Sequence, residues 1–211
     1  MSSLSSSRDT IKKQPPDFSS LQWHELPPEV RIKDFYGGKK WGWVVYRCSY
    51  DKELDTRWED LKRRILENLR KQVAASHVPP LINTMDFIFV EDPALEGATN
   101  DELRARFQAW VPQDCPPWRP ETWRWENSRH DFFLKVDGDL LHEGNVGLIQ
   151  GWILEPRPED CRDEDDMDPE DWFKVRIDDV GIHLYDELDT TENYYHVRSP
   201  PETGPVPLYM Y

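Results

Sequence analysis

Residues 41–73 combine two patterns of different period, and few folds accommodate both in this order. From Trp41 to Tyr50 apolar residues occupy both alternating faces, which is typical of a strand within a core. Thr56 and Glu59 then form a capping box at the start of a helix. One apolar stripe follows at helical spacing: Trp58, Leu61, Ile65, Leu66, Leu69 and Val73. A strand followed by such a helix predicts a domain in which helices cover a sheet.

The same two patterns recur further along the chain. A second helix is expected from the capping box of Thr99 and Glu102 to Pro112. The further strands are expected at Met85–Val90, His130–Val136, Gly147–Leu154 and Trp172–Ile177. The order β-α-β-α-β-β-β predicts an α+β fold of ferredoxin-like or related type, a mixed or antiparallel sheet of about five strands with two helices packed on one face. The second face would be covered by a terminal segment or a second subunit.

Four regions are expected along the 211 residues. Residues 1–20 read as a disordered arm, and residues 21–40 as a docking segment with a short helix. Residues 41–189 form the α+β domain. Residues 190–211 form an extended tail rich in proline and tyrosine.

Composition narrows the classes of function. The formal net charge of −15 argues against binding to nucleic acid or to an anionic membrane. No apolar stretch is long enough for a membrane span, and the N-terminal residues lack the apolar core of a signal peptide. Three unpaired cysteines fit a reducing compartment, so we expect a cytoplasmic protein, with a nuclear location as the alternative.

Three blocks resemble a family of uncharacterised proteins from filamentous fungi. The first is Trp41–Tyr50 with Trp58, the second is Glu91–Ala98 followed by Leu103, Arg104 and Phe107, and the third runs from Phe173 to Tyr185. The resemblance implies one conserved fold and a fungal source, and it implies no activity. The long acidic loop and the long terminal segments depart from the family pattern.

The segment Leu26–Arg31 resembles the opening of an F-box, the helical module that docks onto ubiquitin-ligase adaptors. An F-box continues as helix for roughly forty residues, whereas here Gly37, Gly38 and a strand follow. The segment therefore reads as a short helix docked on the domain.

The usual catalytic and metal-binding motifs are not found in the sequence. The histidines have no zinc spacing, and the acidic run Asp163–Asp168 lacks the glycine and glutamate of an EF-hand. There is no nucleophile elbow and no P-loop. No metal or other cofactor is therefore predicted.

Arg47 is the strongest single candidate for a functional residue. A charge in the middle of an apolar strand must be paired, either with a carboxylate of the chain or with an anionic ligand. Glu91 and Asp92, at the end of the second strand, are the candidate partners. In a pocket, Tyr46 would also line the site, and His130 would be the candidate acid–base residue.

Two surfaces could contact another protein. Residues 118–125 are rich in tryptophan and arginine, the types enriched at interface hot spots; the candidates are Trp118, Trp123, Arg124 and Trp125. The helix at 57–71 carries a local basic face that could meet an acidic partner or the acidic loop of the chain itself.

The sequence therefore supports two functions. The first is a non-catalytic protein-interaction module, whose partner is another protein or a second copy of the chain. The alternative is a small-molecule-binding protein or enzyme of dimeric α+β-barrel type, with a pocket around Arg47. An unpaired Arg47 in a concave apolar pocket would favour the alternative.

Overall fold

The computed structural model describes residues 16–114, 128–152, 172–188, 198–199 and 208–209. The α-helices are α1 (Pro28–Tyr36), α2 (Asp55–Ala75), α3 (Asn100–Asp114), α4 (Ser128–Asp131), α5 (Gly138–Glu143) and α6 (Ile182–Glu187). The 3-10 turns are η1 (Trp23–Glu25), η2 (Lys52–Leu54), η3 (Pro79–Thr84), η4 (Pro93–Leu95) and η6 (Ile177–Asp179). The strands are β1 (Val44–Arg47), β2 (Ile88–Val90), β3 (Phe132–Val136), β4 (Asn145–Gln150), β5 (Trp172–Arg176), β6 (Arg198–Ser199) and β7 (Leu208–Tyr209).

All the described strands belong to one mixed sheet with the order β2-β1-β3-β4-β5-β7-β6. β1 lies parallel to β2 and to β3, whereas β3, β4 and β5 are joined in antiparallel pairs. The register places Val45 opposite Phe89 in β2 and Leu134 in β3. The α+β class and the mixed sheet are thereby confirmed.

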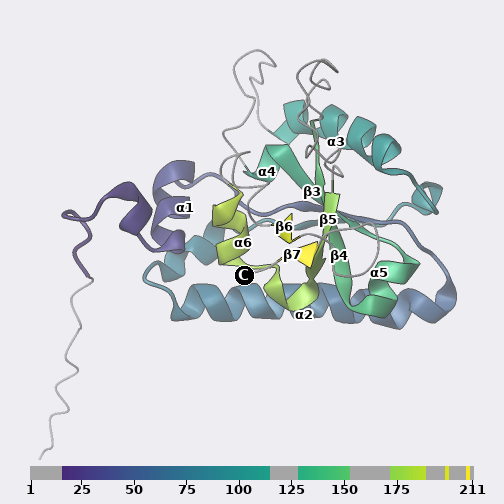
Figure 1. The fold of residues 1–211 in the computed structure, drawn as a ribbon, viewed down its shortest axis with the longest axis horizontal. Helices are drawn as coiled ribbons and strands as arrows, with labels where there is room; N and C mark the ends of the chain where they lie inside the picture. Colours follow the sequence, from purple (N-terminus) through teal and green to yellow (C-terminus); the bar gives the residue numbers. More distant parts are fainter. Residues whose placement is uncertain (1–15, 115–127, 153–171, 189–197, 200–207, 210–211) are drawn as a thin grey trace, which may run out of the picture.

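The two long helices lie on opposite faces of the sheet, as Figure 1 shows for α2 and α3, so the expectation that both cover one face is wrong. The chain passes from β1 to β2 through α2 and returns to the other side of β1, at β3, after α3. Right-handed crossovers in opposite directions place their helices on opposite faces. The ferredoxin-like arrangement, which has both helices on one face, is not confirmed.

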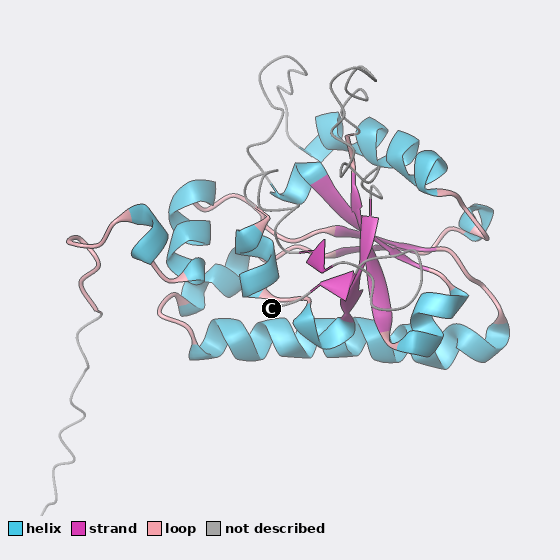
Figure 2. Ribbon diagram, viewed as in Figure 1, coloured by secondary structure: helices cyan, strands magenta, loops and turns pink. Residues whose placement is uncertain are grey.

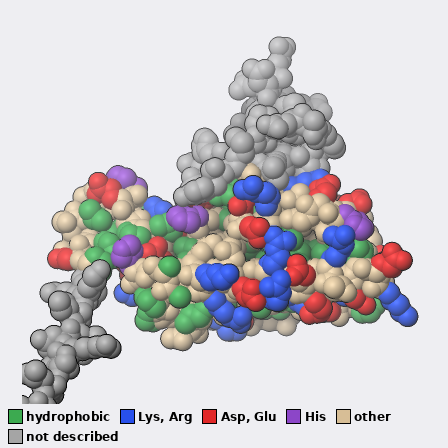
Figure 3. Space-filling model, turned by 90° about the horizontal axis from the view of Figure 1, so that it is seen from below, with side chains coloured by type: hydrophobic (Ala, Val, Ile, Leu, Met, Phe, Trp, Pro, Cys, Tyr) green, Lys and Arg blue, Asp and Glu red, His purple; other side chains and the backbone are tan. Residues whose placement is uncertain are grey.

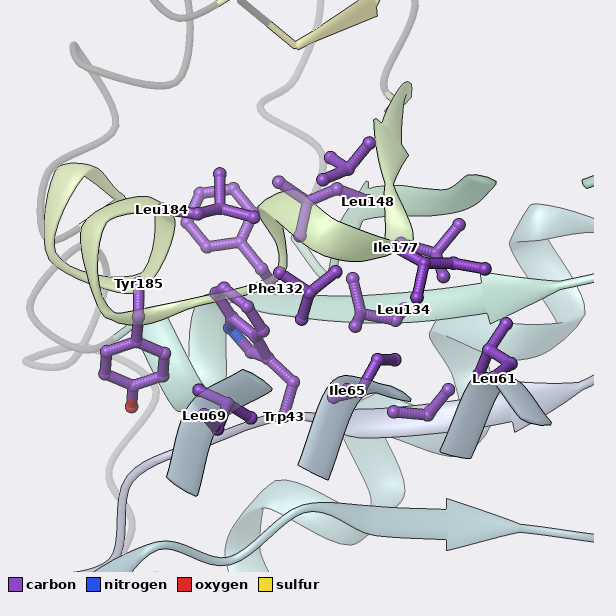
Figure 4. Packing of buried hydrophobic residues seen from close by; sticks show 14 of the residues in the cluster. Trp43, Leu61, Ile65, Leu69, Phe132, Leu134, Leu148, Ile177, Leu184 and Tyr185 are labelled. Atoms are coloured by element: carbon purple, nitrogen blue, oxygen red, sulfur yellow. The ribbon is translucent and has the colours of Figure 1, made fainter. Parts of the chain in front are cut away.

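The core has two layers, separated by the sheet (Figure 2). On the α2 side, Trp43 and Val45 of β1 pack with the helix stripe; Figure 4 shows Leu61, Ile65 and Leu69 directed at the sheet. On the α3 side, Val44 and Tyr46 pack with Leu103, Phe107 and Val111. Both sheet faces are thus covered by helices of the chain itself, and no second subunit is needed to bury either one.

The tail contributes to the sheet. β7 pairs in parallel with β5 through Leu208 and Lys174, and β6 pairs with β7. Tyr209 is buried, and its hydroxyl donates to Glu187 Oε2 at 2.6 Å. The sheet therefore extends beyond the predicted domain boundary at residue 189. Within the described ranges, none of the helices combines the length and apolar composition that a bilayer span requires.

Candidate functional site

Arg47 lies at the carboxyl end of β1, with a side chain that is almost fully buried. Its Nη2 donates to Asp55 Oδ1 at 2.5 Å, its Nε donates to the Ser49 carbonyl at 2.8 Å, and its guanidinium carbon lies 4.7 Å from the centre of the Tyr50 ring. Glu91 Oε2 is 3.8 Å from Nη1. The charge of Arg47 is therefore balanced within the chain, by two carboxylates, a carbonyl and an aromatic face.

The other residues predicted to line an Arg47 site are only partly brought together. Glu91 lies beside Arg47, and its main partner is Lys62, whose Nζ is 2.6 Å away and whose hydrogen bond lowers the pKa of this carboxyl. Asp92 accepts from the Ala94 amide, which lowers its pKa, and also from Arg106 Nη1 at 2.7 Å. Tyr46 points to the opposite face of the sheet and packs against Phe133, and burial raises its pKa to about 12. Tyr46 and Arg47 therefore do not share a site.

Open α/β sheets bind ligands at the carboxyl ends of two adjacent strands from which the chain continues in opposite directions along the sheet. In this sheet those two strands are β1 and β3. In this chain its own loops occupy that edge. The Cys48 carbonyl accepts from the Gly97 amide at 2.9 Å, and the Tyr50 amide donates to Glu96 at 2.5 Å. Leu54 lies so close to Gly138 that a Cβ there would come within 3.3 Å of Leu54 Cδ1. The described loops therefore pack against one another across this edge of the sheet.

His130 lies at the opposite edge, just before β3, in a buried network of charged groups. Its Nε2 is 3.0 Å from Asp114 Oδ2, and its carbonyl accepts from Trp152 Nε1 at 2.8 Å. Burial lowers the pKa of His130, and the hydrogen bond and charge of Asp114 oppose this shift only in part. Burial alone would raise the pKa of Asp114, but Arg129 and His130 lower it below its ordinary value.

Arg129 is the centre of this network and is 1% exposed. Its Nε donates to Asp114 at 2.7 Å and its Nη2 to Asp86 at 2.8 Å. Its Nη1 donates to the carbonyls of Gly42 at 3.0 Å and Asp86 at 2.7 Å. One guanidinium thus joins the amino ends of β1 and β2 to the end of α3. Sequence reasoning missed this group; the only signal was a charged residue just before an apolar strand.

The Arg129 network accounts for the burial of His130, so no catalytic role is needed to explain it. An acid–base residue must reach its substrate, whereas both sides of this imidazole are enclosed, by Trp110 at 5.9 Å between ring centres and by the Asp114 carboxylate. His130 is therefore best described as part of a buried ion-pair cluster.

The docking segment is joined to the domain by an ion pair and by a hydrogen-bonded contact between a carboxylate and a histidine. Arg31 of α1 binds Asp186 of α6 in a two-pronged contact whose Nε–Oδ1 distance is 3.0 Å. Glu29 accepts from the His77 amide at 3.0 Å and lies 2.7 Å from its Nδ1. Pro28 starts the helix, and Gly37, in the left-handed conformation, ends it. The structure thus has a short helix, α1, in the segment for which the sequence predicts one.

This segment carries all the large exposed hydrophobic residues of the described chain. Trp23 and Phe35 are each 46% exposed, and Leu21 is 40% exposed. Figure 3 shows hydrophobic side chains on the lobe at the left, which η1 and α1 form. We call Leu21, Trp23 and Phe35 the N-terminal apolar surface.

Two further predictions concern the tryptophan- and arginine-rich segment and metal binding. Trp118, Trp123, Arg124 and Trp125 lie outside the described residues. Within the described ranges, no three His, Cys, Asp or Glu side chains are placed so that they could hold a metal ion.

The fold and this site define a class of protein: an α+β domain in which the buried arginines of the described residues pair with carboxylates of the chain, and against which an N-terminal helix is docked. No protein-family model matches the chain, no curated protein matches it, and no solved structure matches it. The resemblance to a filamentous-fungal family stays a prediction.

Proposed function

We propose that this chain is a non-catalytic protein-interaction module whose contact surface is the N-terminal apolar surface. The observation that carries the proposal is the exposure of Trp23, at 46%, on a segment that the Arg31–Asp186 ion pair and the Glu29–His77 contact hold against the domain. Exposed apolar side chains on a segment that is fixed to a domain are typical of a protein-binding surface. Tryptophan is also among the residue types that contribute most to such interfaces.

The support of this surface matters as much as its composition. Val30 and Ile32 are buried beneath α1, and the Asp186 side chain that binds Arg31 is 4% exposed. A surface that is already ordered loses little conformational entropy when a partner binds. The segment therefore has the apolar character and the rigidity that a docking surface needs.

The alternative, a ligand pocket around Arg47, gains no support from the described residues. That reading requires an unpaired guanidinium beside an apolar cavity, and Arg47 is paired with Asp55. The partner we expect is a protein of the cytoplasm or nucleus, a setting consistent with the free, buried Cys48.

Site-specific photo-crosslinking tests the proposal. Benzoylphenylalanine in place of Trp23 should crosslink to a polypeptide in an extract of the native source, because this position faces the partner. The matched control has the same group in place of Ala105, which is exposed on α3. A second copy of this chain as the crosslinked product would identify a homodimer. Crosslinking at neither position, or equally at both, would contradict the proposal.

A further inference from the structure

Strand β2 forms one edge of the sheet, and β1 is its only neighbour among the described strands. The Ile88 amide donates to the Trp43 carbonyl at 3.1 Å, so the backbone of Ile88 is directed at β1. Because backbone groups alternate in direction along an extended chain, the N–H and C=O groups of Phe87 and Phe89 point away from β1. The edge therefore presents a row of backbone donors and acceptors that can pair with a further strand.

The side chains along this edge are apolar on both faces of the sheet. Phe87 and Phe89 pack on the α2 side, and Ile88 and Val90 pack on the α3 side. Every residue from 85 to 90 is nevertheless partly exposed. The other edge of the described sheet is β6, which has only two residues, an arginine and a serine. Natural sheets protect an edge with such short, charged strands, and β2 has neither a charged residue nor a proline.

The ion pairs around the edge leave it without excess charge. The carboxylates of residues 85–92 each bind a basic side chain of the chain itself: Asp86 binds Lys40 at 3.0 Å, Glu91 binds Lys62 at 2.6 Å and Asp92 binds Arg106 at 2.7 Å. Two copies of a chain with a net charge of −15 repel each other over most of their surface. A neutral edge is the place where a second copy approaches at the lowest electrostatic cost.

The edge also matches a second copy of itself residue by residue. In an antiparallel pair with Ile88 opposite Ile88, Phe87 of one copy exchanges both backbone hydrogen bonds with Phe89 of the other. The phenylalanine side chains of this pair lie on the same face of the sheet, and aromatic pairs across strands are stabilising. In this register Asp86 and Glu91 both stand opposite apolar residues, so no two carboxylates face each other.

We propose that β2 pairs with β2 of a second copy of this chain, antiparallel and about a two-fold axis, so that the two sheets become continuous. One short strand from each copy makes the contact, and contacts of this size are weak. The expected Kd is on the order of 100 µM. At about 5 µM this dimer is largely dissociated, so it is distinct from the partner proposed for the N-terminal apolar surface.

Sedimentation velocity of the full-length chain at physiological ionic strength tests the proposal. The sedimentation coefficient should rise with concentration as the dimer forms. Lys40→Glu should weaken the dimer about fivefold or more, because it makes the edge acidic in both copies. Arg176→Glu on β5 is the matched control with the same change in net charge. The two basic side chains are 62% and 66% exposed, and each binds one carboxylate.

The control should weaken the dimer less than about twofold, since its charge lies away from the contact. Thermal unfolding curves check that both variants keep the fold. Equal weakening in the two variants would show repulsion between whole molecules and would overturn the proposal. So would a sedimentation coefficient that does not depend on concentration.

Amide hydrogen exchange locates the contact. The amides of Phe87 and Phe89 should exchange more slowly at high concentration than at low, because only the dimer bonds them, whereas the Ile88 amide should not change. Exchange at Phe87 and Phe89 that is the same at both concentrations would contradict the proposal. A dimer that is lost on combining Leu21→Ala with Trp23→Ala would place the association at the N-terminal apolar surface instead. Crosslinking at Trp23 reports on that other surface, so either proposal can fail alone.

Discussion

Arg47 and Arg129 are both buried arginines beside strand ends, and each is bound by carboxylates of its own chain. A buried guanidinium needs such partners because desolvation strongly disfavours an isolated charge. The sequence was sufficient to predict that Arg47 is paired, and Glu91 was correctly named as a neighbour. Its closest carboxylate, Asp55, was not predicted, because the pairing depends on how η2 turns the chain back over β1.

Arg129 could not be predicted from its local sequence. Its partners Asp86 and Asp114 are 43 and 15 residues away along the chain, and only the arrangement of β1, β2 and α3 brings them together. The same holds for His130, whose sequence position suggested a titratable site residue. Its burial against Asp114 depends on where α3 ends.

Replacement of Arg129 by methionine should lower the free energy of unfolding by about 3–5 kcal/mol, because it leaves two carboxylates without their buried counter-charge. Urea unfolding followed by tryptophan fluorescence measures this change. Arg176→Met is the control, since the Arg176 side chain is 66% exposed and pairs with Asp179 at 2.7 Å. Its loss should cost less than about 1 kcal/mol. Similar losses for the two variants would show that the Arg129 network does not stabilise the fold.

At the scale of the elements, periodicity predicted most of the architecture. The stripe from Trp58 to Val73 is the buried face of α2, and the five predicted strands all exist with bounds shifted by a few residues. The prediction that Pro112 ends the second helix is wrong, because α3 continues to Asp114. A proline near the end of a helix removes only one backbone bond. Here Arg129 and His130 hold the final turn through Asp114.

The short helices α4, α5 and α6 are not predicted from the sequence, because their position also depends on tertiary contacts. α4, α5 and α6 have between four and six residues, too few to show a helical period. Their positions follow from tertiary contacts, such as the Arg31 contact with Asp186 that anchors α6 to α1.

Gly42 lies between two buried tryptophans just before β1, where the backbone needs a residue without a Cβ atom. Its φ is +112°, and a Cβ would lie 2.8 Å from the Asp86 carbonyl oxygen. Gly42→Ala should therefore cost roughly 3 kcal/mol or more, from backbone strain and the clash together. Thermal and urea unfolding give the value.

Gly97 provides the comparison for Gly42. Its φ is +65°, yet a Cβ there would meet nothing within 4 Å. Gly97→Ala should cost only about 1–2 kcal/mol, the strain of a left-handed residue. An equal loss at the two glycines would mean that the approach of Asp86 and Phe87 to Gly42 is not tight.

At the scale of the whole molecule, the strand order decides which face of the sheet each helix covers, a question that the sequence left open. Alternating patterns show that strands exist but not which strands are neighbours. Once β3 is placed beside β1, the two helices must cover opposite faces, and the question of what covers the second face is answered. Among the described residues, the large exposed hydrophobic side chains all lie on the docking segment, and we therefore propose that the interaction takes place there.

Native mass spectrometry of the full-length chain from its native source tests this assignment most directly. The double variant with Leu21→Ala and Trp23→Ala is the comparison, since both side chains are exposed and their removal leaves the core intact. The unaltered chain should carry a second polypeptide, and the double variant should not. A chain that instead sheds a small molecule or metal on denaturation, or that carries the same polypeptide in both forms, would contradict it.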